Sequence, residues 1–364
     1  MSSCLESRVE VALYGAGCAS MSLAARAGEL PTHKMTVVAP PGFDHDDHVW
    51  GFWDMPWLAH LADKKRKTWQ KWRIISADRM IEHRSAAHPY AAINRHCWIE
   101  NCASQARHFG VNFITSLARK DNIQILDSRP PAPPSGCIIQ HFRGYEIVTK
   151  DACFDPSTAI LMDFRCDQSR GIHFIYCLPF SPKRALVEST LFSTEIASPD
   201  YYDHSIRTYL SEIIGISDFT IDRQESGAIP MAFLGRFDPS YQGIGGNGGA
   251  IRPSSGYAFS FIQKQVAQIL RDARAGKKLV VKCPHSRFTL LMDRIFLRVL
   301  RRYPSLAPSI FTKMASVLTG DEFARFLSSE GTISTWAKVI FAMPKLPFIR
   351  ALLPVWERGG LRRW

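Results

Sequence analysis

The residues with the clearest potential to bind a cofactor form a glycine turn near the start of the chain. Gly15-Ala16-Gly17-Cys18-Ala19-Ser20 follows the apolar run Val9–Tyr14. In a dinucleotide-binding fingerprint the first glycine makes the tight turn, the second admits a pyrophosphate and the third allows close helix packing. Serine takes the third position here, and Ala39 stands where an acidic ribose-binding residue is expected. The turn favours a dinucleotide, without separating FAD from NAD, over an ordinary strand–turn–helix of an α/β core.

A carboxyl group within an apolar strand is the main candidate for acid–base chemistry. Glu188 lies in the run Arg184–Thr190, and the two-residue period of a strand places Leu186, Glu188 and Thr190 on one face. Desolvation disfavours the charged form of a carboxyl group there, which raises its pKa and suits a general acid. The alternative is an edge-strand glutamate that faces water.

Two further segments have residue types that could hold a ligand or a metal ion. The glycine-rich run 243–257 ends in Gly256 and Tyr257, which open a predicted helix over 255–273. Glycines allow close backbone approach and a helix N-terminus attracts anions, so we favour a ligand there over a flexible loop.

The run Asp44-His45-Asp46-Asp47-His48 has metal-ligating residue types. No helix or strand fixes their spacing, so we favour a solvated loop and predict no metal site.

Aromatic and C-terminal residues suggest an apolar ligand and a surface for binding. One short stretch carries six large aromatic side chains, which could line a tunnel, stabilise a cation or simply form core: Trp50, Phe52, Trp53, Trp57, Trp69 and Trp72. Between residues 340 and 355, Lys345 and Arg350 alternate with apolar side chains. This pattern indicates either a membrane-binding patch or a helix docked on the domain with a basic outer face.

Composition excludes several classes of protein. The chain has 364 residues, of which 46% are hydrophobic and 21% charged, so it is neither a disordered tail nor a disulfide mini-protein. Its net charge is +12, and residues 281–364 hold 14 Lys/Arg against 5 Asp/Glu. Charge without a recognition motif does not support nucleic acid as a partner.

Cysteine usage and hydropathy indicate the compartment. The chain has nine cysteines, an odd number, and no CxxC pair. This cysteine usage is typical of proteins in a reducing compartment. The N-terminus is polar and lacks a secretory signal, and no apolar run reaches the ~18 residues needed to span a bilayer. We therefore expect a cytoplasmic protein.

The order of predicted elements indicates two interleaved units. Strands over 9–14 and 35–38 flank a small-residue helix in a βαβ pattern, and Asn94 is a predicted N-cap for a helix through Phe109. Residues 43–90 lack a clean period and predict an excursion from the sheet. Strand follows strand from 137 to 192. The fold class is α/β: a Rossmann-like nucleotide-binding domain (1–46, 91–136 and 226–275), an interleaved antiparallel β-sheet substrate domain (47–90 and 137–225) and a helical, basic C-terminal region (276–364).

Short motifs in a fixed order make the chain resemble the bacterial lycopene β-cyclases, a family of flavoproteins. The glycine turn is similar to their FAD fingerprint, and Asp47-His48-Val49-Trp50-Gly51-Phe52 is similar to their His-x-Trp-x-Phe element. The other similar motifs are, in chain order, Leu126-Asp127-Ser128-Arg129, Gln140-His141-Phe142-Arg143-Gly144-Tyr145-Glu146, Leu161-Met162-Asp163, Tyr176-Cys177-Leu178-Pro179, Leu186-Val187-Glu188-Ser189-Thr190, Glu225-Ser226-Gly227-Ala228-Ile229-Pro230, Arg252-Pro253-Ser254-Ser255-Gly256-Tyr257 and Met292-Asp293-Arg294-Ile295-Phe296-Leu297. They extend from about residue 10 to about residue 330.

The resemblance implies an enzyme that closes the acyclic end groups of lycopene, or of a related acyclic carotenoid, into β rings. A proton added at C2 leaves a cation at C1, the C5–C6 alkene attacks it, and loss of a proton completes the ring without net redox change. Reduced FAD is nonetheless required in the family, with NAD(P)H as the expected electron source. Because a C40 polyene dissolves only in a membrane, the basic C-terminal third implies peripheral membrane association.

The resemblance also implies roles for individual residues. Glu188 falls on the glutamate that acts as acid and base in the family, and Asp163 and Glu225 are candidates for proton relay or cation stabilisation. The nucleotide-binding domain becomes an FAD-binding domain, with the cofactor held by Gly15, Ala16, Gly17, Cys18, Ala19, Ser20, Asp127, Arg252, Gly256 and Tyr257.

Two other functions remain open from the sequence. A flavin-dependent oxidoreductase of the hydroxylase type would use the same fold, but it would consume NAD(P)H with each product. A non-enzymatic membrane- or nucleic-acid-binding protein that has kept the fold would lack bound FAD.

Overall fold

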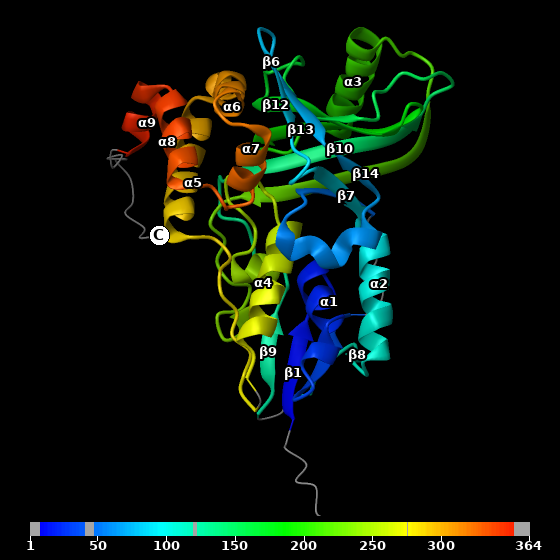
Figure 1. The fold of residues 1–364 in the computed structure, drawn as a ribbon, viewed down its shortest axis with the longest axis vertical. Coiled ribbons are helices and arrows are strands. Elements are labelled where there is room, and N and C mark those ends of the chain that lie inside the picture. Colours follow the sequence, from blue (N-terminus) through cyan, green and yellow to red (C-terminus); the bar gives the residue numbers. More distant parts are fainter. Residues whose placement is uncertain (1–7, 41–46, 119–121, 275, 353–364) are drawn as a thin grey trace, which may run out of the picture.

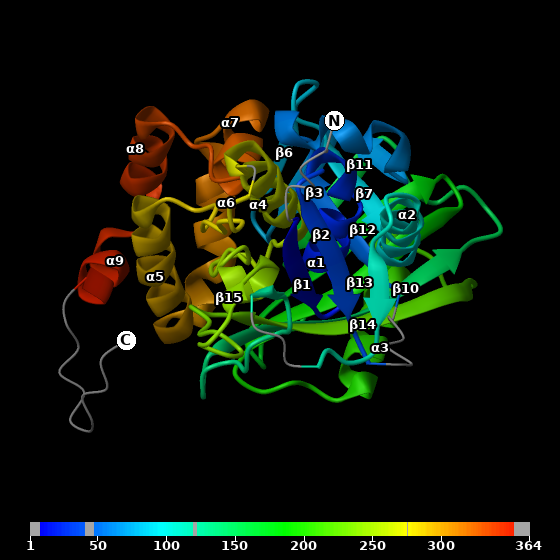
Figure 2. The ribbon, with the colours of Figure 1, turned by 90° about the horizontal axis from the view of Figure 1, so that it is seen from below.

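The structure is a computed structural model that describes residues 8–40, 47–118, 122–274 and 276–352. Figure 1 shows three regions: a parallel-sheet unit at the bottom, a large antiparallel sheet at the top, and a group of C-terminal helices beside them. Figure 2 shows the same helices at one side of the molecule when it is seen from below. The predicted α/β fold class, with a Rossmann-like unit, an antiparallel sheet and a helical region, is confirmed.

The parallel-sheet unit contains five strands in the order β15-β9-β1-β2-β8. The strands are β1 (Val9–Tyr14), β2 (His33–Val38), β8 (Asn112–Ile114), β9 (Gln124–Asp127) and β15 (Gln242–Gly243). Val11, Ala12 and Leu13 are successive buried residues of β1, because a parallel sheet is covered on both faces. The helices of this unit are α1 (Cys18–Ala24), α2 (Arg95–His108) and α4 (Phe259–Asp272), and α1 contacts both others.

The antiparallel unit is a seven-stranded sheet in the order β14-β10-β13-β12-β11-β5-β6. Its strands are β5 (Lys71–Ile75), β6 (Met80–Arg84), β10 (Ile138–Val148), β11 (Thr158–Asp163), β12 (Ile172–Ser181), β13 (Arg184–Ser193) and β14 (Thr220–Met231); only β5 and β11 pair in parallel. Helix α3 (Pro199–Tyr209) covers one face, where Ile147, Val187 and Ile206 form a core. Alternation along β13 sends Leu186, Glu188 and Thr190 to the other face.

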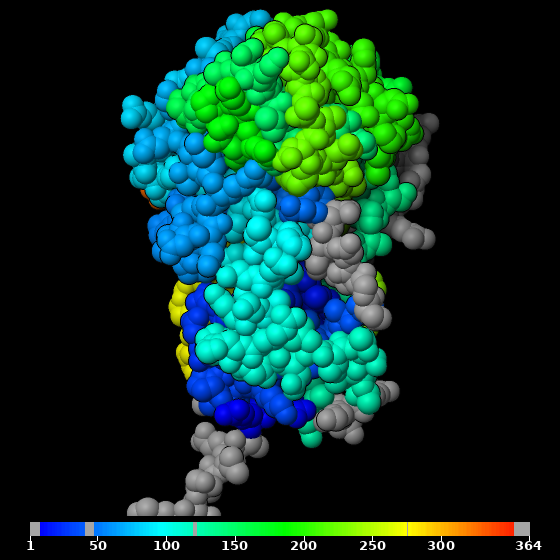
Figure 3. All heavy atoms as spheres, turned by 90° about the vertical axis from the view of Figure 1, so that its right-hand side faces the viewer, coloured from blue at the N-terminus to red at the C-terminus, as the bar shows by residue number. Residues whose placement is uncertain are grey.

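The segment 47–90 is not the irregular excursion that its mixed composition suggested. It contributes β5 and β6 to the large sheet, and β3 (Val49–Trp53), β4 (Lys67–Trp69) and β7 (Tyr90–Asn94) to a three-stranded sheet. A 3-10 helix, η2 (Pro56–Lys64), links β3 and β4. Trp53, Trp69 and Trp72 are fully buried here. On the face drawn in Figure 3, this segment lies above α2 and below the large sheet.

Side-chain caps begin three of the five described C-terminal helices. They are α5 (Arg287–Arg302), α6 (Ala307–Ser316), α7 (Gly320–Leu327), α8 (Ile333–Ala342) and α9 (Lys345–Leu352). Ser286 caps α5, Thr319 forms a capping box with Glu322 on α7, and Thr332 caps α8. No helix within the described residues is both long enough and apolar enough to cross a membrane.

Two predicted boundaries differ from the structure. The boundary expected at residue 226 falls inside β14, which continues to Met231 and pairs with β10 along its length. Helix α4 begins at Phe259 instead of Ser255. The preceding residues form a tight turn in which the Gly256 N–H donates to the Arg252 carbonyl at 2.9 Å and Gly256 has φ +69°. A helix cannot run through this left-handed residue.

Candidate active site

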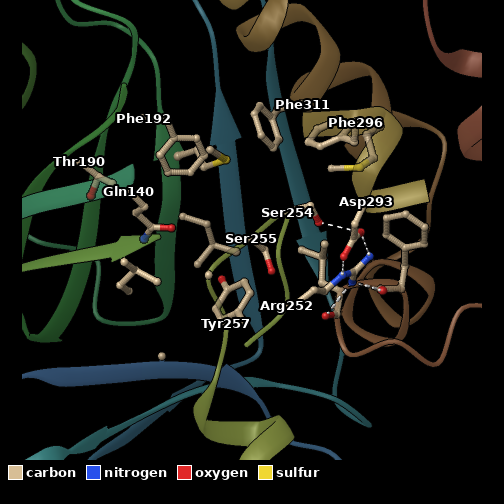
Figure 4. Close-up of a pocket in the computed structure, with 18 of the residues that line it drawn as sticks. Gln140, Thr190, Phe192, Arg252, Ser254, Ser255, Tyr257, Asp293, Phe296 and Phe311 are labelled. Carbon is tan, nitrogen blue, oxygen red and sulfur yellow. Dashed lines mark hydrogen bonds and ion pairs between the residues drawn. The ribbon is translucent and has the colours of Figure 1, made fainter. Parts of the chain in front are cut away.

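A large apolar cavity of about 1040 Å³ lies between the large sheet, the parallel-sheet unit and the C-terminal helices. It extends from Cys18, at the glycine turn, to Phe341 on α8 and Leu352 on α9. Most of its lining is aromatic or aliphatic, and Figure 4 shows Phe192 on one wall with Phe296 and Phe311 on another. A polyene is an apolar, elongated molecule, and this lining matches that chemistry.

The predicted acid Glu188 lines this cavity, and Glu225 lies next to it behind the wall. In the sheet register Gly144 of β10 stands directly between Glu188 of β13 and Glu225 of β14. A β-carbon on Gly144 would lie 3.2 Å from Glu188 Cβ and 3.3 Å from Glu225 Cγ. The glycine of the Gln-x-Phe-x-Gly-x-Glu motif therefore lets two carboxyl groups approach each other. Glu225 is not among the cavity-lining residues.

Both carboxyl groups bind protons more strongly than an ordinary glutamate. Burial raises the pKa of Glu188, and the neighbouring Glu225 raises it further, while a hydrogen bond from the Thr190 hydroxyl at 2.5 Å opposes the rise. Burial also raises the pKa of Glu225, but the positive charge of Arg223 opposes that effect. The Val49 N–H donates to Glu225 Oε2 at 3.2 Å. The pKa of Glu188 is therefore raised, which is the direction that the strand pattern predicts.

Replacing the glycine between the carboxyl groups should separate them. We expect Gly144→Ala to reduce turnover by less than about 10²-fold, the effect of displacing a catalytic group by about 1 Å, because these neighbouring side chains need to move by only a few tenths of an ångström. The new methyl group would also lie 3.2 Å from Leu186 Cδ1, so the Leu186 side chain must shift together with the two glutamate side chains. Gly235→Ala is the control, since a β-carbon there has no neighbour within 4 Å. Steady-state kinetics with matched flavin content would test this, and equal rates for the two variants would contradict it.

Three tyrosine hydroxyl groups form the polar cluster opposite Glu188. Tyr90 Oη lies 2.8 Å from Tyr176 Oη and 3.4 Å from Tyr257 Oη. Burial raises the pKa of all three phenols well above the usual value, and Glu188 adds to that rise, so the cluster stays neutral. Gly51 makes room for it, because a β-carbon there would lie 2.2 Å from Tyr90 Oη.

Sequence reasoning missed Tyr90 and Tyr176 and predicted a cofactor contact for Tyr257. The three residues come from β7, β12 and the turn before α4, so no local spacing connects them. Their hydroxyl groups face Glu188 in the cavity. The glycine of the His-x-Trp-x-Phe element is the one signal in the sequence that reflects their position.

The predicted cofactor turn has the shape that a dinucleotide requires. Gly15 has φ +89°, and a β-carbon on Gly17 would enter open space with no atom within 4 Å. No side chain caps the N-terminus of α1, and Cys18 opens into the cavity. Ser20 at the third glycine position is buried and donates a hydrogen bond to Ser128 Oγ at 2.8 Å. Ala19 meets Gly245 closely, since a β-carbon on Gly245 would lie 2.5 Å from Ala19 Cβ.

Two buried polar atoms on the cavity wall also point to a bound group. Ser255 Oγ and Trp53 Nε1 have no hydrogen-bond partner among the described residues, although both atoms are fully buried and both residues line the cavity. Buried polar groups normally have partners, so a ligand with hydrogen-bonding atoms would satisfy them. Ser255 precedes Gly256 and the N-terminus of α4, where a second cofactor contact was predicted. The turn, α4 and these atoms fit a flavin dinucleotide.

The side chains of Asp127 and Arg252, two of the predicted cofactor-binding residues, both have protein partners in the structure. Asp127 is fully buried and accepts hydrogen bonds from Arg129 Nε at 2.9 Å and Nη2 at 2.8 Å, so it braces the loop beside the glycine turn. Arg252 donates to Asp293 and to the carbonyls of Phe326 and Leu327, as Figure 4 shows for Asp293. These contacts hold both side chains in place, and Arg252 also lines the cavity.

Asp163 lies on the α3 side of the sheet and is not among the described residues that line the cavity. The ladder between β11 and β12 is irregular between Ile160 and Asp163, and this irregularity turns Asp163 toward α3. Its carboxylate pairs with Arg165 at 2.7 Å and accepts a hydrogen bond from the Tyr209 hydroxyl at 3.0 Å. Strand periodicity could not reveal this side chain's direction, because an irregular ladder breaks the two-residue alternation.

The candidate metal-ligating run divides between described and undescribed positions. Asp44, His45 and Asp46 lie outside the described residues. Asp47 accepts a hydrogen bond from the His96 N–H at 3.1 Å, and His48 Nε2 lies 2.6 Å from the Ser226 carbonyl. Among the described residues no group of three or more His, Cys, Asp or Glu has metal-ligating geometry.

Comparison with solved structures shows which class of protein has this fold. The chain is similar to a geranylgeranyl bacteriochlorophyll reductase-like protein from Thermoplasma acidophilum, with a TM-score of 0.58, 12% identity and coverage of 91% of this chain and 95% of that one. It is also similar to the flavin-dependent brominase Bmp2, with a TM-score of 0.55, 13% identity and coverage of 92% and 97%. The fold is that of flavin-dependent enzymes.

Sequence comparison identifies the family within this class. The family described as "Lycopene cyclase protein" matches residues 121–353, and the chain belongs to it. It is 23% identical over 387 residues to a lycopene beta-cyclase of Pantoea ananas, covering 96% of this chain and 98% of the relative. It is 24% identical over 396 residues to a lycopene beta-cyclase of Paracoccus sp. (strain N81106 / MBIC 01143), covering 97% and 98%. The predicted resemblance is confirmed, and the chain is an enzyme of this kind.

Proposed function

We propose that this protein cyclises the acyclic end groups of lycopene, or of a closely related acyclic carotenoid, to β rings. The observation that carries the proposal is a buried carboxyl group with a raised pKa, Glu188, in the wall of an apolar cavity of about 1040 Å³. Membership of the lycopene cyclase family supports the substrate class. A hydrocarbon offers no polar atom to bind, so shape and apolar lining must hold it while the acid supplies the chemistry.

In this proposal Glu188 donates the proton that starts the reaction and accepts the proton that is lost at its end. Its carboxyl group protonates C2 of the end group, and the C1 cation is captured by the C5–C6 alkene to close the ring. Glu188, now a carboxylate in the cavity, accepts the proton lost from C6, so the enzyme returns to its first state. Tyr90, Tyr176 and Trp53 place aromatic rings near this acid, and such rings stabilise cations through their π faces. The apolar lining excludes water that would trap the cation.

The cofactor in this proposal is FAD in its reduced form, with NAD(P)H as the electron source. The turn Gly15–Ser20 and the N-terminus of α4 would hold it, and Ser255 Oγ would gain a partner. Reduced flavin supplies negative charge that stabilises the developing cation. Residues 1–46, 91–136 and 232–275 form the FAD-binding domain in this assignment. The sheet domain takes 47–90 and 137–231, since β14 ends at Met231, and residues 276–364 form the helical region.

We further propose that α8 and α9 face a membrane surface. Phe341 and Leu352 are 77% and 59% exposed, yet both line the cavity, so its mouth lies at these helices. A carotenoid substrate, which dissolves only in lipid, would pass from the bilayer into the cavity without crossing water. Lys345 lines the cavity, and α5, α8 and α9 carry further exposed basic side chains that would face anionic headgroups: Arg294, Arg298, Arg301, Lys338 and Arg350.

The membrane assignment predicts a localised effect of polar substitution. We expect Phe341→Ser with Leu346→Ser to reduce flotation with anionic liposomes by about tenfold, because two exposed apolar side chains are lost. Met80→Ser with Ile196→Ser is the matched control, since these residues are similarly exposed elsewhere. Flotation at low and high salt would be measured, and binding should weaken with salt. Equal flotation of both double variants would contradict the assignment.

The proposed reaction can be tested with the purified protein. Protein, FAD and dithionite would be incubated anaerobically with lycopene in liposomes, and the carotenoids separated by chromatography. Cyclic carotene formed with catalytic reductant supports the proposal. A flavin-loaded protein that forms no cyclic product, or whose product requires stoichiometric NAD(P)H, would favour a hydroxylase-type oxidoreductase. Absence of bound flavin would favour a non-enzymatic role.

A further inference from the structure

Arg223 connects the catalytic region to a buried ionic cluster in the large sheet. It lies on β14, two residues before Glu225, so both side chains share one face. Arg223 Nη2 lies 2.8 Å from Glu225 Oε2, and its Nε lies 3.4 Å from Glu146 Oε2. Its Nη1 donates to the Asp47 carbonyl at 2.7 Å. These contacts fix the guanidinium group beside Glu225.

Glu146 anchors Arg223 because it is fully ionised. It is 3% exposed and contacts Arg66 Nη1 at 2.9 Å and Arg184 Nη1 at 2.8 Å, in addition to Arg223. Burial raises the pKa of Glu146, but the hydrogen bonds from Arg66 and Arg184 and the charge of Arg223 outweigh burial and lower the pKa to about 2. The cluster is therefore charged at every pH at which the enzyme would work.

The surroundings of Glu188 and Glu225 are electrostatically unequal. Within the described part of the chain no ion pair of Glu188 is found; Thr190 of β13, Tyr176 of β12, Tyr90 of β7 and Tyr257 before α4 face it, all uncharged. Glu225 faces Arg223 on its own strand and the Val49 N–H of β3, while Asp47 opposes them. Two adjacent buried carboxyl groups cannot both ionise easily, so the one beside the cation loses its proton first.

We propose that Arg223 is a positioning residue that determines which of the two carboxyl groups carries the proton. It holds Glu225 as the carboxylate, and the negative charge of Glu225 keeps the proton on Glu188, the partner that lines the cavity. Without Arg223 the same proton moves to Glu225, behind the wall, where it cannot reach a substrate. This inference rests on the proposed cyclisation only for its kinetic consequence, because the location of the proton is a property of the protein alone.

The kinetic test is the pH dependence of turnover in Arg223→Gln. Loss of the cation should raise the pKa of Glu225 by about 1–3 units, and a neutral Glu225 no longer supports protonation of Glu188. If the pKa of Glu188 falls from about 8 by a similar amount, the alkaline limit of activity moves to lower pH, with a loss of about 2- to 100-fold at neutral pH that acidification restores. Arg223→Lys keeps the charge and should keep most of the wild-type profile.

The control is Arg184→Gln, which removes a different arginine from the same cluster. Arg184 contacts Glu146 and Asp222, and no contact of it with Glu225 occurs among the described residues. We expect Arg184→Gln to leave the alkaline limit in place, even if it lowers the melting temperature. A shift of equal size in both variants would overturn the proposal, because general damage to the cluster would then explain it.

Glu225→Gln keeps the proposal testable if Arg223→Gln does not fold. A permanently neutral side chain at 225 should move the alkaline limit in the same direction, and adding Arg223→Gln should move it no further, because Arg223 acts through Glu225. Infrared titration of the carboxylic acid carbonyl band needs no carotenoid: the band absent from Glu188→Gln should persist to higher pH in wild type than in Glu225→Gln. An unchanged band and an unchanged limit in Glu225→Gln would overturn the proposal, whether or not the proposed reaction is correct.

Discussion

Glu188→Gln should abolish ring closure while leaving the fold and the flavin content unchanged. Glutamine has nearly the same shape and can still accept the Thr190 hydrogen bond made at 2.5 Å, but its amide cannot protonate an alkene. A positioned general acid contributes about 10²- to 10⁴-fold to the rate, and the raised pKa values of the lining tyrosines make their phenols weaker proton donors than the Glu188 carboxyl group. Product formation under anaerobic, flavin-reduced conditions is the measurement.

The same substitution should change stability in the opposite direction to activity. The pKa of Glu188 is raised in the folded protein, so the folded state binds more protons than the unfolded chain between the ordinary glutamate pKa of about 4.3 and the raised folded value. Wild-type stability therefore falls as pH increases through this range. Glu188→Gln removes this pH-dependent loss of stability. The difference between the melting temperatures of the variant and the wild type should therefore increase from pH 4 to pH 8.

A solvent-exposed glutamate provides the control for both measurements. Glu82 on β6 pairs with Arg73 at the surface, so Glu82→Gln should change turnover by less than twofold and show no pH-dependent gain in stability. Residual cyclisation by Glu188→Gln above about a tenth of the wild-type rate would assign the proton donor to another residue. A pH-independent stability difference would show that Glu188 is not a neutral acid in the folded protein.

Local patterns predict the elements whose physical causes are local. Val9–Tyr14, the glycine turn and the helix that begins after Asn94 are recognisable because apolar runs, glycine conformation and helix-start signals act over a few neighbouring residues. Glu188 is recognisable for the same reason, since an acid within an apolar strand is visible in seven residues. The strands of 47–90 escape such patterns because buried tryptophans alternate there with charged residues that pair across the sheet, as Arg73 does with Glu82.

Features that depend on pairing between distant segments could not be predicted from spacing. The approach of Glu225 to Glu188 depends on the register of β10 with two other strands, and the tyrosine cluster depends on the docking of two sheets. The direction of Asp163 depends on an irregular ladder, and the partner of Arg252 lies 41 residues away. The motifs of the family resemblance include both carboxyl groups and Arg252, but the contacts of these residues depend on the three-dimensional structure.

Arg252→Met should destabilise the protein strongly. Arg252 and Asp293 are 2% exposed and form a bidentate pair with both contacts at 3.3 Å; Ser254 also donates to Asp293 at 2.8 Å. Removing one partner leaves a buried, uncompensated charge, which costs about 3–5 kcal/mol. Arg252 also holds the end of α7 through the Phe326 and Leu327 carbonyls, so the C-terminal helices should loosen first. Denaturant unfolding would measure the loss.

Two further variants separate this structural role from cofactor binding. Arg252→Met combined with Asp293→Asn removes both charges and should recover about half of the lost stability or more, since a neutral pair carries a much smaller desolvation penalty. Lys338→Met breaks a surface ion pair with Glu322 in the same helical region and should cost less than about 1 kcal/mol. If Arg252 instead bound a flavin phosphate, Arg252→Met would weaken FAD binding with little change in unfolding of the flavin-free protein, and the second substitution would restore nothing. The buried pair predicts the reverse, because the arginine that joins the glycine-rich turn to α5 and α7 has no donor directed at the cofactor turn.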